Sequence, residues 1–230
     1  MEITSVIIFS LIFVLVVWNI FLRPASEGAP EELATPSLLV EETSMYKVMV
    51  NRDKIYDLVD GAASNCKWTQ VATHEQFEKY CISKDTIQDT SEAISAHEEK
   101  GFCSETSLRY IEYYGLLQAV YLQQDSILAL HRLFGETKDL NLSECSGWNE
   151  IREMRNDTVG HPVGRRKRLN RNQISYDDVH YMDIKKENIE SWESYHVNLR
   201  KLLHRYGDEA AEVLGELHEC IRKTCDLDKA

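Results

Sequence analysis

Glycine and proline are scarce in this chain, whose 230 residues include ten glycines and four prolines. The sequence has no glycine-rich phosphate loop, no Gly-x-Ser-x-Gly turn of serine hydrolases and no His-Glu-x-x-His pair of zinc proteases. Its six cysteines form no Cys-x-x-Cys pair, and a chain of this length does not need disulfides for stability. We therefore expect reduced thiols, no metal site and no cofactor.

Positive charge is also in short supply. The chain has 26 lysines and arginines against 38 aspartates and glutamates, which gives a formal net charge of -12. Nonspecific binding to nucleic acid depends on neutralising phosphates with lysine and arginine. The charge balance therefore excludes a protein that coats nucleic acid, and any such contact has to be local.

One long hydrophobic run is present near the N-terminus. Residues 3–22 carry no charge, and this length matches the ~20 residues that a helix needs to cross a bilayer core. A cleaved secretory signal is the alternative, but no lysine or arginine precedes the run, which exceeds the usual ~7 to 15 apolar residues of a signal. We expect 1–23 to be a transmembrane anchor. Arg23 is the only basic residue near the run, and the positive-inside tendency places the following domain in the cytoplasm.

After the anchor, the sequence predicts a linker and a helical domain. Residues 24–43 contain three of the four prolines and five glutamates, a composition typical of a flexible acidic linker. In 44–230 apolar residues recur mostly at helical spacing, which predicts an all-α bundle and suggests a short β-hairpin near 173–184. The expected helices cover 46 to 61 or 65, 73–81, 86–99, 104–134, 141 or 143 to 159, and 189–225 with a break near Gly207.

The segment 104–134 is the clearest helix in the sequence. Its broad apolar face predicts a core helix, and Gly135 marks its end; we place on that face Leu108, Ile111, Tyr114 or Gly115, Leu117, Val120, Tyr121, Ile127, Leu128 and Leu130. Three polar residues, Gln123, Gln124 and Asp125, interrupt this face. They either line a site or point to solvent, and we favour solvent.

The run from Arg155 to His161 places a guanidinium and an imidazole at the end of one predicted helix. Arginine offers a planar fork of donors for phosphate, and histidine can transfer a proton near neutral pH. A straight helix would separate the two side chains by about 9 Å along its axis. Gly160 in a left-handed conformation can turn the chain back and bring them together. The alternative is an ordinary helix end, closed by Gly160 and followed by Pro162.

The run Arg155-Asn156-x-x-x-Gly160-His161 resembles the motif of the HEPN superfamily, in which an arginine is followed by four to six residues and then a histidine. A polar residue commonly follows that arginine. Residues 113–125 and 148–154 are similar to the two central helices of bacterial HEPN-type proteins, and the likeness covers about 104–166. HEPN domains are helical bundles that usually pair as homodimers, and many are metal-independent ribonucleases.

This resemblance implies a chemical role for each motif residue. His161 would act as general base toward a ribose 2′-hydroxyl, and Arg155 would stabilise the charge that grows on the phosphate. Asn156 would orient the phosphate or the imidazole, or it serves only as a local backbone partner. The product would be a 2′,3′-cyclic phosphate, and DNA would be refused because it lacks the 2′-hydroxyl.

A basic run follows the motif. We expect it to attract RNA locally, without reading its sequence; the residues are Arg165, Arg166, Lys167, Arg168 and Arg171. A solvated loop and attraction to anionic lipid are the alternatives. The favoured reading is a membrane-anchored HEPN-like endoribonuclease. A catalytically inactive HEPN-like RNA-binding or adaptor module is the second reading, and a helical membrane protein with a well-capped helix is the third.

Overall fold

The computed structural model describes residues 43–61, 64, 66, 68–134, 140–160, 173–174, 178–184 and 192–227, with side chains up to 159 and from 196 to 223. The chain divides into two units, Met1–Leu39 and Val40–Ala230, and every described residue belongs to the second. No helix in the described ranges is long and apolar enough to cross a membrane. The anchor expected at 3–22 lies outside these ranges, as does the linker except for its last residue.

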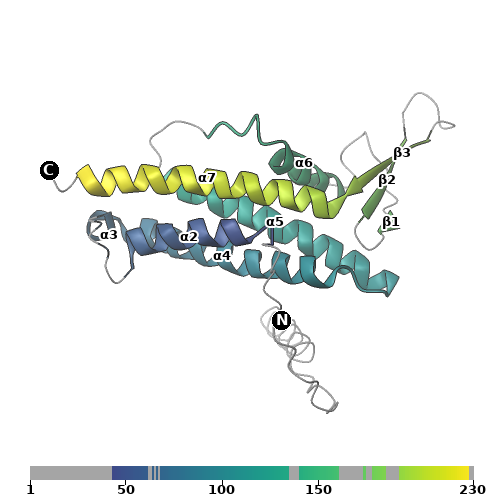
Figure 1. Ribbon diagram of the computed structural model, residues 1–230, viewed down its shortest axis with the longest axis horizontal. Helices are drawn as coiled ribbons and strands as arrows, with labels where there is room; N and C mark the ends of the chain where they lie inside the picture. Colours follow the sequence, from purple (N-terminus) through teal and green to yellow (C-terminus); the bar gives the residue numbers. More distant parts are fainter. Residues whose placement is uncertain are drawn as a thin grey trace, which may run out of the picture. The chain divides into compact units, whose positions relative to one another are not determined.

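The domain is mostly helical in its described part, as the sequence predicts. Its bundle is formed by α2 (Tyr46–Val59), α4 (His74–Lys100), α5 (Thr106–Phe134) and α7 (Leu199–Leu227) (Figure 1). Helix α4 packs against α2 and α5, and α7 packs against α2 and α5. The shorter α6 (Ser146–Arg155) packs on α5 and α7, and α3 (Trp68–Val71) is a single turn. The largest fully buried side chains include Trp148, Tyr80, Tyr113, Tyr206, Ile87 and Leu117.

Helix α4 is continuous where the sequence predicts two helices, at 73–81 and 86–99. Thr73 starts it with a capping box, because its hydroxyl accepts the backbone N–H of Gln76 and its own N–H is bound by the Gln76 side chain. The polar residues between the two predicted helices do not break it. Ser83 is buried, and the Lys84 ammonium lies over the Tyr56 ring, 4.6 Å from its centroid.

Helix α7 also continues through Gly207, where the sequence suggested a break. A Cβ atom at Gly207 would lie 2.4 Å from the backbone oxygen of Ser44, just before α2. Glycine therefore serves here for close packing of two chain segments, although it costs about 1 kcal/mol in helix propensity relative to alanine. The predicted break is wrong because Gly207 is needed for a close contact with Ser44, which is far away in the sequence.

Replacing Gly207 by alanine is expected to destabilise the domain by about 1–3 kcal/mol, because the added methyl overpacks against backbone that cannot rotate away. Gly215→Ala in the same helix is the matched control, since its Cβ would meet only the Asn51 side chain at 3.4 Å. Urea unfolding of both variants measures the difference. Equal midpoints for the two variants would contradict the packing role of Gly207.

Three strands precede α7 in the described part of the chain. They are β1 (Gln173–Ile174), β2 (Asp178–Ile184) and β3 (Trp192–Asn198), paired antiparallel in the order β1-β2-β3. Strands β1 and β2 lie where a hairpin was suggested, and β3 occupies residues expected to be helical. Aromatic and β-branched residues suit strand pairing, and Tyr195 and Val197 of β3 lie in register with Tyr181 and Val179 of β2.

The buried face of α5 differs from the predicted one. Leu108, Ile111 and Tyr114, which were assigned to the core, are exposed. Gln123 and Gln124, which were expected to face solvent, are fully buried. Leu117, Val120, Ile127 and Leu130 are buried as predicted, so the face is confirmed in part. The pattern misplaced its remaining residues because α5 is apolar on more than one side and carries two glutamines in the core.

The cysteine prediction needs one correction. Cys66 is disulfide-bonded, whereas Cys81, Cys103, Cys145 and Cys220 are free thiols. Disulfides persist mainly in oxidising compartments. The bond at Cys66 therefore does not favour a cytoplasmic domain, and that orientation stays a prediction from Arg23.

Candidate functional site

Helix α6 ends with Arg155, the arginine of the predicted motif, and a side chain of α7 caps the N-terminal end of this helix. The helix that was expected to start at Asn141 or Ser143 starts later, because α6 begins at Ser146 and its cap residue makes no side-chain hydrogen bond. Instead, the Glu209 carboxylate of α7 accepts the backbone N–H groups of Gly147 and Trp148 at 3.0 and 2.7 Å. A carboxylate at this end of a helix also complements the helix dipole.

The C-terminal end of α6 passes into a π-helical turn, η1 (Asn156–Gly160). The Asn156 N–H bonds the carbonyls of Arg152 and Glu153, and the buried Thr158 hydroxyl donates to the Met154 carbonyl at 2.7 Å. The helical path thus includes Gly160. The left-handed conformation expected there is wrong, because Gly101 is the glycine with a positive φ in the described ranges and Gly160 continues the helical turn. Single π-helical turns within helices are frequent at functional sites.

Arg155, the last residue of α6, has neutral partners in the described structure. Its Nε and Nη2 donate to Gln118 Oε1 at 3.3 and 3.1 Å, and its Nη1 donates to Asn156 Oδ1 at 3.2 Å. The guanidinium also lies over the Tyr121 ring, 3.9 Å from its centroid. None of these groups carries a formal negative charge at neutral pH, so they orient the half-buried cation without neutralising it.

Arg152 lies one turn earlier on α6 and has a different environment. Its Nη2 donates to the Asp125 carboxylate at 2.9 Å, and its Nη1 donates to Gln124 Oε1 at 3.2 Å. It shares the Tyr121 ring with Arg155, at 4.5 Å from the centroid. The carboxylate compensates the charge of Arg152, which leaves Arg155 as the better anion-binding group of the two.

The predicted site residues are therefore only partly described. Arg155 and Asn156 are in contact, so Asn156 does more than bond its local backbone. His161 lies outside the described residues, as does the basic run of Arg165, Arg166, Lys167, Arg168 and Arg171. The structure adds Gln118 and Tyr121 of α5, which the sequence analysis did not assign to the site. Their spacing of three residues puts them on one helix face, but only the packing of α5 on α6 reveals the arginine opposite.

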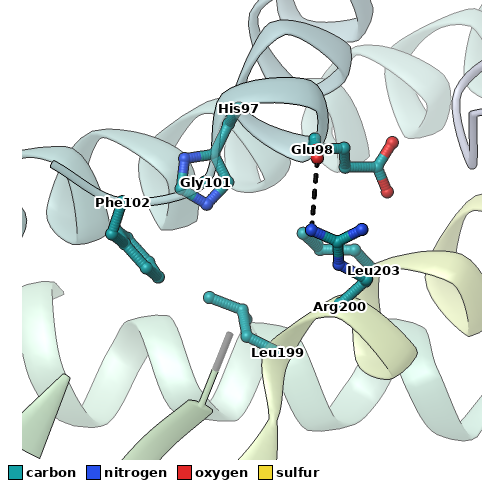
Figure 2. A pocket seen from close by; sticks show the side chains of 7 residues that line it. All are labelled: His97, Glu98, Gly101, Phe102, Leu199, Arg200 and Leu203. Carbon is teal, nitrogen blue, oxygen red and sulfur yellow. Dashed lines mark hydrogen bonds between the residues drawn. The ribbon is translucent and has the colours of Figure 1, made fainter. Parts of the chain in front are cut away.

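A separate hollow lies where the end of α4 meets the start of α7 (Figure 2). His97, Glu98 and Phe102 line one side, and Leu199, Arg200 and Leu203 line the other. The Arg200 side chain donates to the Glu98 backbone oxygen at 3.4 Å across it. No group of three or more metal-ligating side chains occurs in the described ranges.

No protein family, curated protein or solved structure matches this chain. The functional assignment therefore depends on the chain's own residues. Two features of the chain bear on its function. One is the motif from Arg155 to His161, and the other is that Arg155 hydrogen-bonds to the uncharged side chains of Gln118 and Asn156.

Proposed function

We propose that this protein is a membrane-anchored HEPN-like endoribonuclease that cleaves RNA without a metal ion. The observation that carries the proposal is Arg155, a half-buried arginine at a helix end whose described partners are all neutral. A guanidinium oriented in this way matches the geometry and charge of a phosphate. The anchor at 3–22 holds the domain at the lipid bilayer, and the cytoplasmic side, where RNA is present, is proposed from Arg23 alone.

In the proposed reaction, the ribose 2′-hydroxyl attacks the adjacent phosphorus. His161 takes the proton of the hydroxyl, a bond forms between the 2′-oxygen and phosphorus, and the bond from phosphorus to the 5′-oxygen breaks. The leaving oxygen gains a proton and becomes a 5′-hydroxyl, and the other fragment ends in a 2′,3′-cyclic phosphate. Arg155 stabilises the charge on the phosphoryl oxygens, and Asn156 helps to hold Arg155 in position.

The basic run at 165–171 steers RNA toward this site in the proposal. Five cations close to the motif raise the local concentration of a polyanion, although the chain as a whole is acidic. Binding should therefore weaken steeply with added salt. Contacts to the phosphates give register and affinity, and they leave the choice of cleavage site to other parts of the protein.

The exposed face of α5 supports the expectation of a homodimer. Leu108, Ile111, Gly115, Gln118 and Leu122 follow one another at alternating spacings of three and four residues, the pattern of a helix that pairs with another helix. A Cβ atom at Gly115 would meet nothing within 4 Å, which leaves room for a close approach. Because Gln118 also binds Arg155, pairing along this face would bring two copies of the site together.

Replacing Ile111 by lysine is expected to convert the dimer to a monomer, because the Ile111 side chain is 67% exposed in the single chain. Ile111 also lies within the stripe formed by the five residues of α5 named above. Ile82→Lys is the matched control, since Ile82 is 59% exposed on α4 and lies outside the stripe. Light scattering of the full-length protein in detergent gives the mass of each. A wild-type monomer, or a dimer that survives Ile111→Lys, would contradict pairing through α5.

Incubation of the full-length protein in detergent with RNA and an excess of chelator tests the proposed activity. We expect cleavage of RNA and none of DNA of the same sequence. Activity that requires an added divalent metal would contradict the mechanism, and an absence of cleavage under all conditions would contradict the enzyme.

The second candidate is a catalytically inactive HEPN-like module that binds RNA or serves as an adaptor. One observation favours it: three of the five N–H groups of Arg155 are already engaged by Gln118 and Asn156. An inactive module would bind RNA without cleaving it, which a gel shift with the same RNA measures. RNA binding without cleavage therefore supports this second candidate.

A further inference from the structure

Two arginines of α6 face a row of three side chains on α5. Arg155 meets Gln118 and Arg152 meets Asp125, and the Tyr121 ring contacts both guanidinium groups. The two arginines are three residues apart and lie on neighbouring turns of α6. Their partners Gln118 and Asp125 are seven residues apart, about two turns of α5, and Tyr121 lies on the turn between them. The main difference between the pairs is an amide in one and a carboxylate in the other.

We propose that Gln118 is a positioning residue that orients Arg155 for phosphate while leaving its charge uncompensated. The inference rests on the proposed function, because it concerns the same phosphate-binding group. It also assigns Arg152 to the packing of α6 on α5, although that arginine touches the same aromatic ring. The identity of the residue at 118 thus decides which arginine of α6 receives the phosphate.

The geometry at Gln118 explains how an amide can do this. One amide oxygen accepts both Nε and Nη2 of Arg155, so a single neutral group fixes one edge of the guanidinium. Asn156 fixes Nη1, and the Tyr121 ring covers one face. These contacts restrict the side chain, which lowers the entropy lost when a phosphate binds.

A carboxylate at position 118 would bind the same edge much more strongly. Arginine and carboxylate form two parallel charge-assisted hydrogen bonds, and the pair has no net charge. A phosphate would then have to displace that carboxylate or bind beside it. Arg152 already has this arrangement with Asp125, and Gln124 holds it further in place.

Gln118→Glu and Asp125→Asn form a reciprocal test of the inference. The probe is a fluorescent 2′-O-methyl RNA, which cannot be cleaved because it lacks the attacking hydroxyl, bound to full-length protein in detergent at several salt concentrations. We expect Gln118→Glu to weaken binding at least tenfold and to lower the slope of log affinity against log salt by about one. Asp125→Asn frees Arg152 and should leave binding unchanged or strengthen it.

Thermal unfolding of the same variants shows whether a loss of RNA binding comes from the changed position of Arg155 or from damage to the fold. A new ion pair to Arg155 should leave the melting temperature of Gln118→Glu equal to that of wild type or higher, while RNA binding falls. Equal RNA binding by Gln118→Glu and wild type would overturn the inference. It would also be overturned if Asp125→Asn weakens binding as much, because disturbed packing between α5 and α6 would then explain both losses.

The outcomes also distinguish this inference from the proposed activity. If the wild-type protein binds the probe but never cleaves RNA, the proposed nuclease activity is wrong. The role of Gln118 is then still decided by whether Gln118→Glu binds the probe more weakly. A wild type that cleaves RNA and is matched by Gln118→Glu in binding and rate contradicts the role of Gln118 alone. A wild type that does not bind the probe contradicts the placement of a phosphate at Arg155.

Discussion

Replacing Arg155 by alanine is expected to lower the rate of RNA cleavage by about 10²- to 10³-fold, the usual loss when one group that stabilises the transition-state charge is removed. Single-turnover cleavage by full-length protein in chelator measures it. Arg155→Lys should lose most of this activity too, because an ammonium cannot place two donors on Gln118 Oε1 while a third reaches Asn156.

The matched control for this prediction is Arg132→Ala. Arg132 is an exposed arginine near the end of α5, so its replacement removes the same charge without touching α6. We expect nearly wild-type cleavage from it. Equal rates for Arg155→Ala and wild type would show that the end of α6 is not the reactive site.

Replacing Gln123 by leucine is expected to destabilise the domain by about 1–3 kcal/mol, because it leaves the buried Tyr206 hydroxyl without its acceptor, whereas Ser91 still donates to the Ile87 carbonyl. Gln123 is fully buried and joins three helices. Its amide donates to Ser91 Oγ of α4 at 2.8 Å and accepts the Tyr206 hydroxyl of α7 at 2.8 Å. Burial raises the pKa of Tyr206 well above its ordinary value, so this hydroxyl remains a donor. Urea unfolding monitored by circular dichroism measures the loss.

The Tyr206→Phe background provides the control for that measurement. With the tyrosine hydroxyl already removed, Gln123→Leu leaves one fewer buried group unsatisfied and should cost less than it does in wild type. A coupling energy of about 1 kcal/mol or more is expected from the double-mutant cycle. Strict additivity would mean that the bond between Gln123 and Tyr206 does not stabilise the fold.

The sequence predicts the helices better than it predicts their buried faces. Helix α5 could be located because its apolar residues are dense and recur at helical spacing over many turns. Its buried face could be predicted only in part, since Leu117 and Ile127 are in the core as expected but Gln123 is buried and Ile111 is exposed. A buried glutamine becomes favourable only when Ser91 and Tyr206 supply its hydrogen bonds, and these come from helices distant in sequence.

The same distinction holds for the candidate site. Arg155 and Asn156 could be proposed from the sequence because they belong to a local motif, and their role stays a prediction. Gln118 and Tyr121 could not, because their proximity to Arg155 depends on how α5 packs against α6. The start of α6 was missed for a similar reason, since Glu209 of α7 provides the carboxylate that local capping rules seek nearby in sequence.

The 3′ ends of RNA fragments produced in chelator test the central claim most directly. Mass spectrometry distinguishes a 2′,3′-cyclic phosphate from a 3′-hydroxyl, and His161→Ala provides the comparison for the histidine. Our account predicts cyclic-phosphate ends from the wild-type protein and none from His161→Ala. Fragments that end in a 3′-hydroxyl, or equal yields of cyclic phosphate from both proteins, would contradict it.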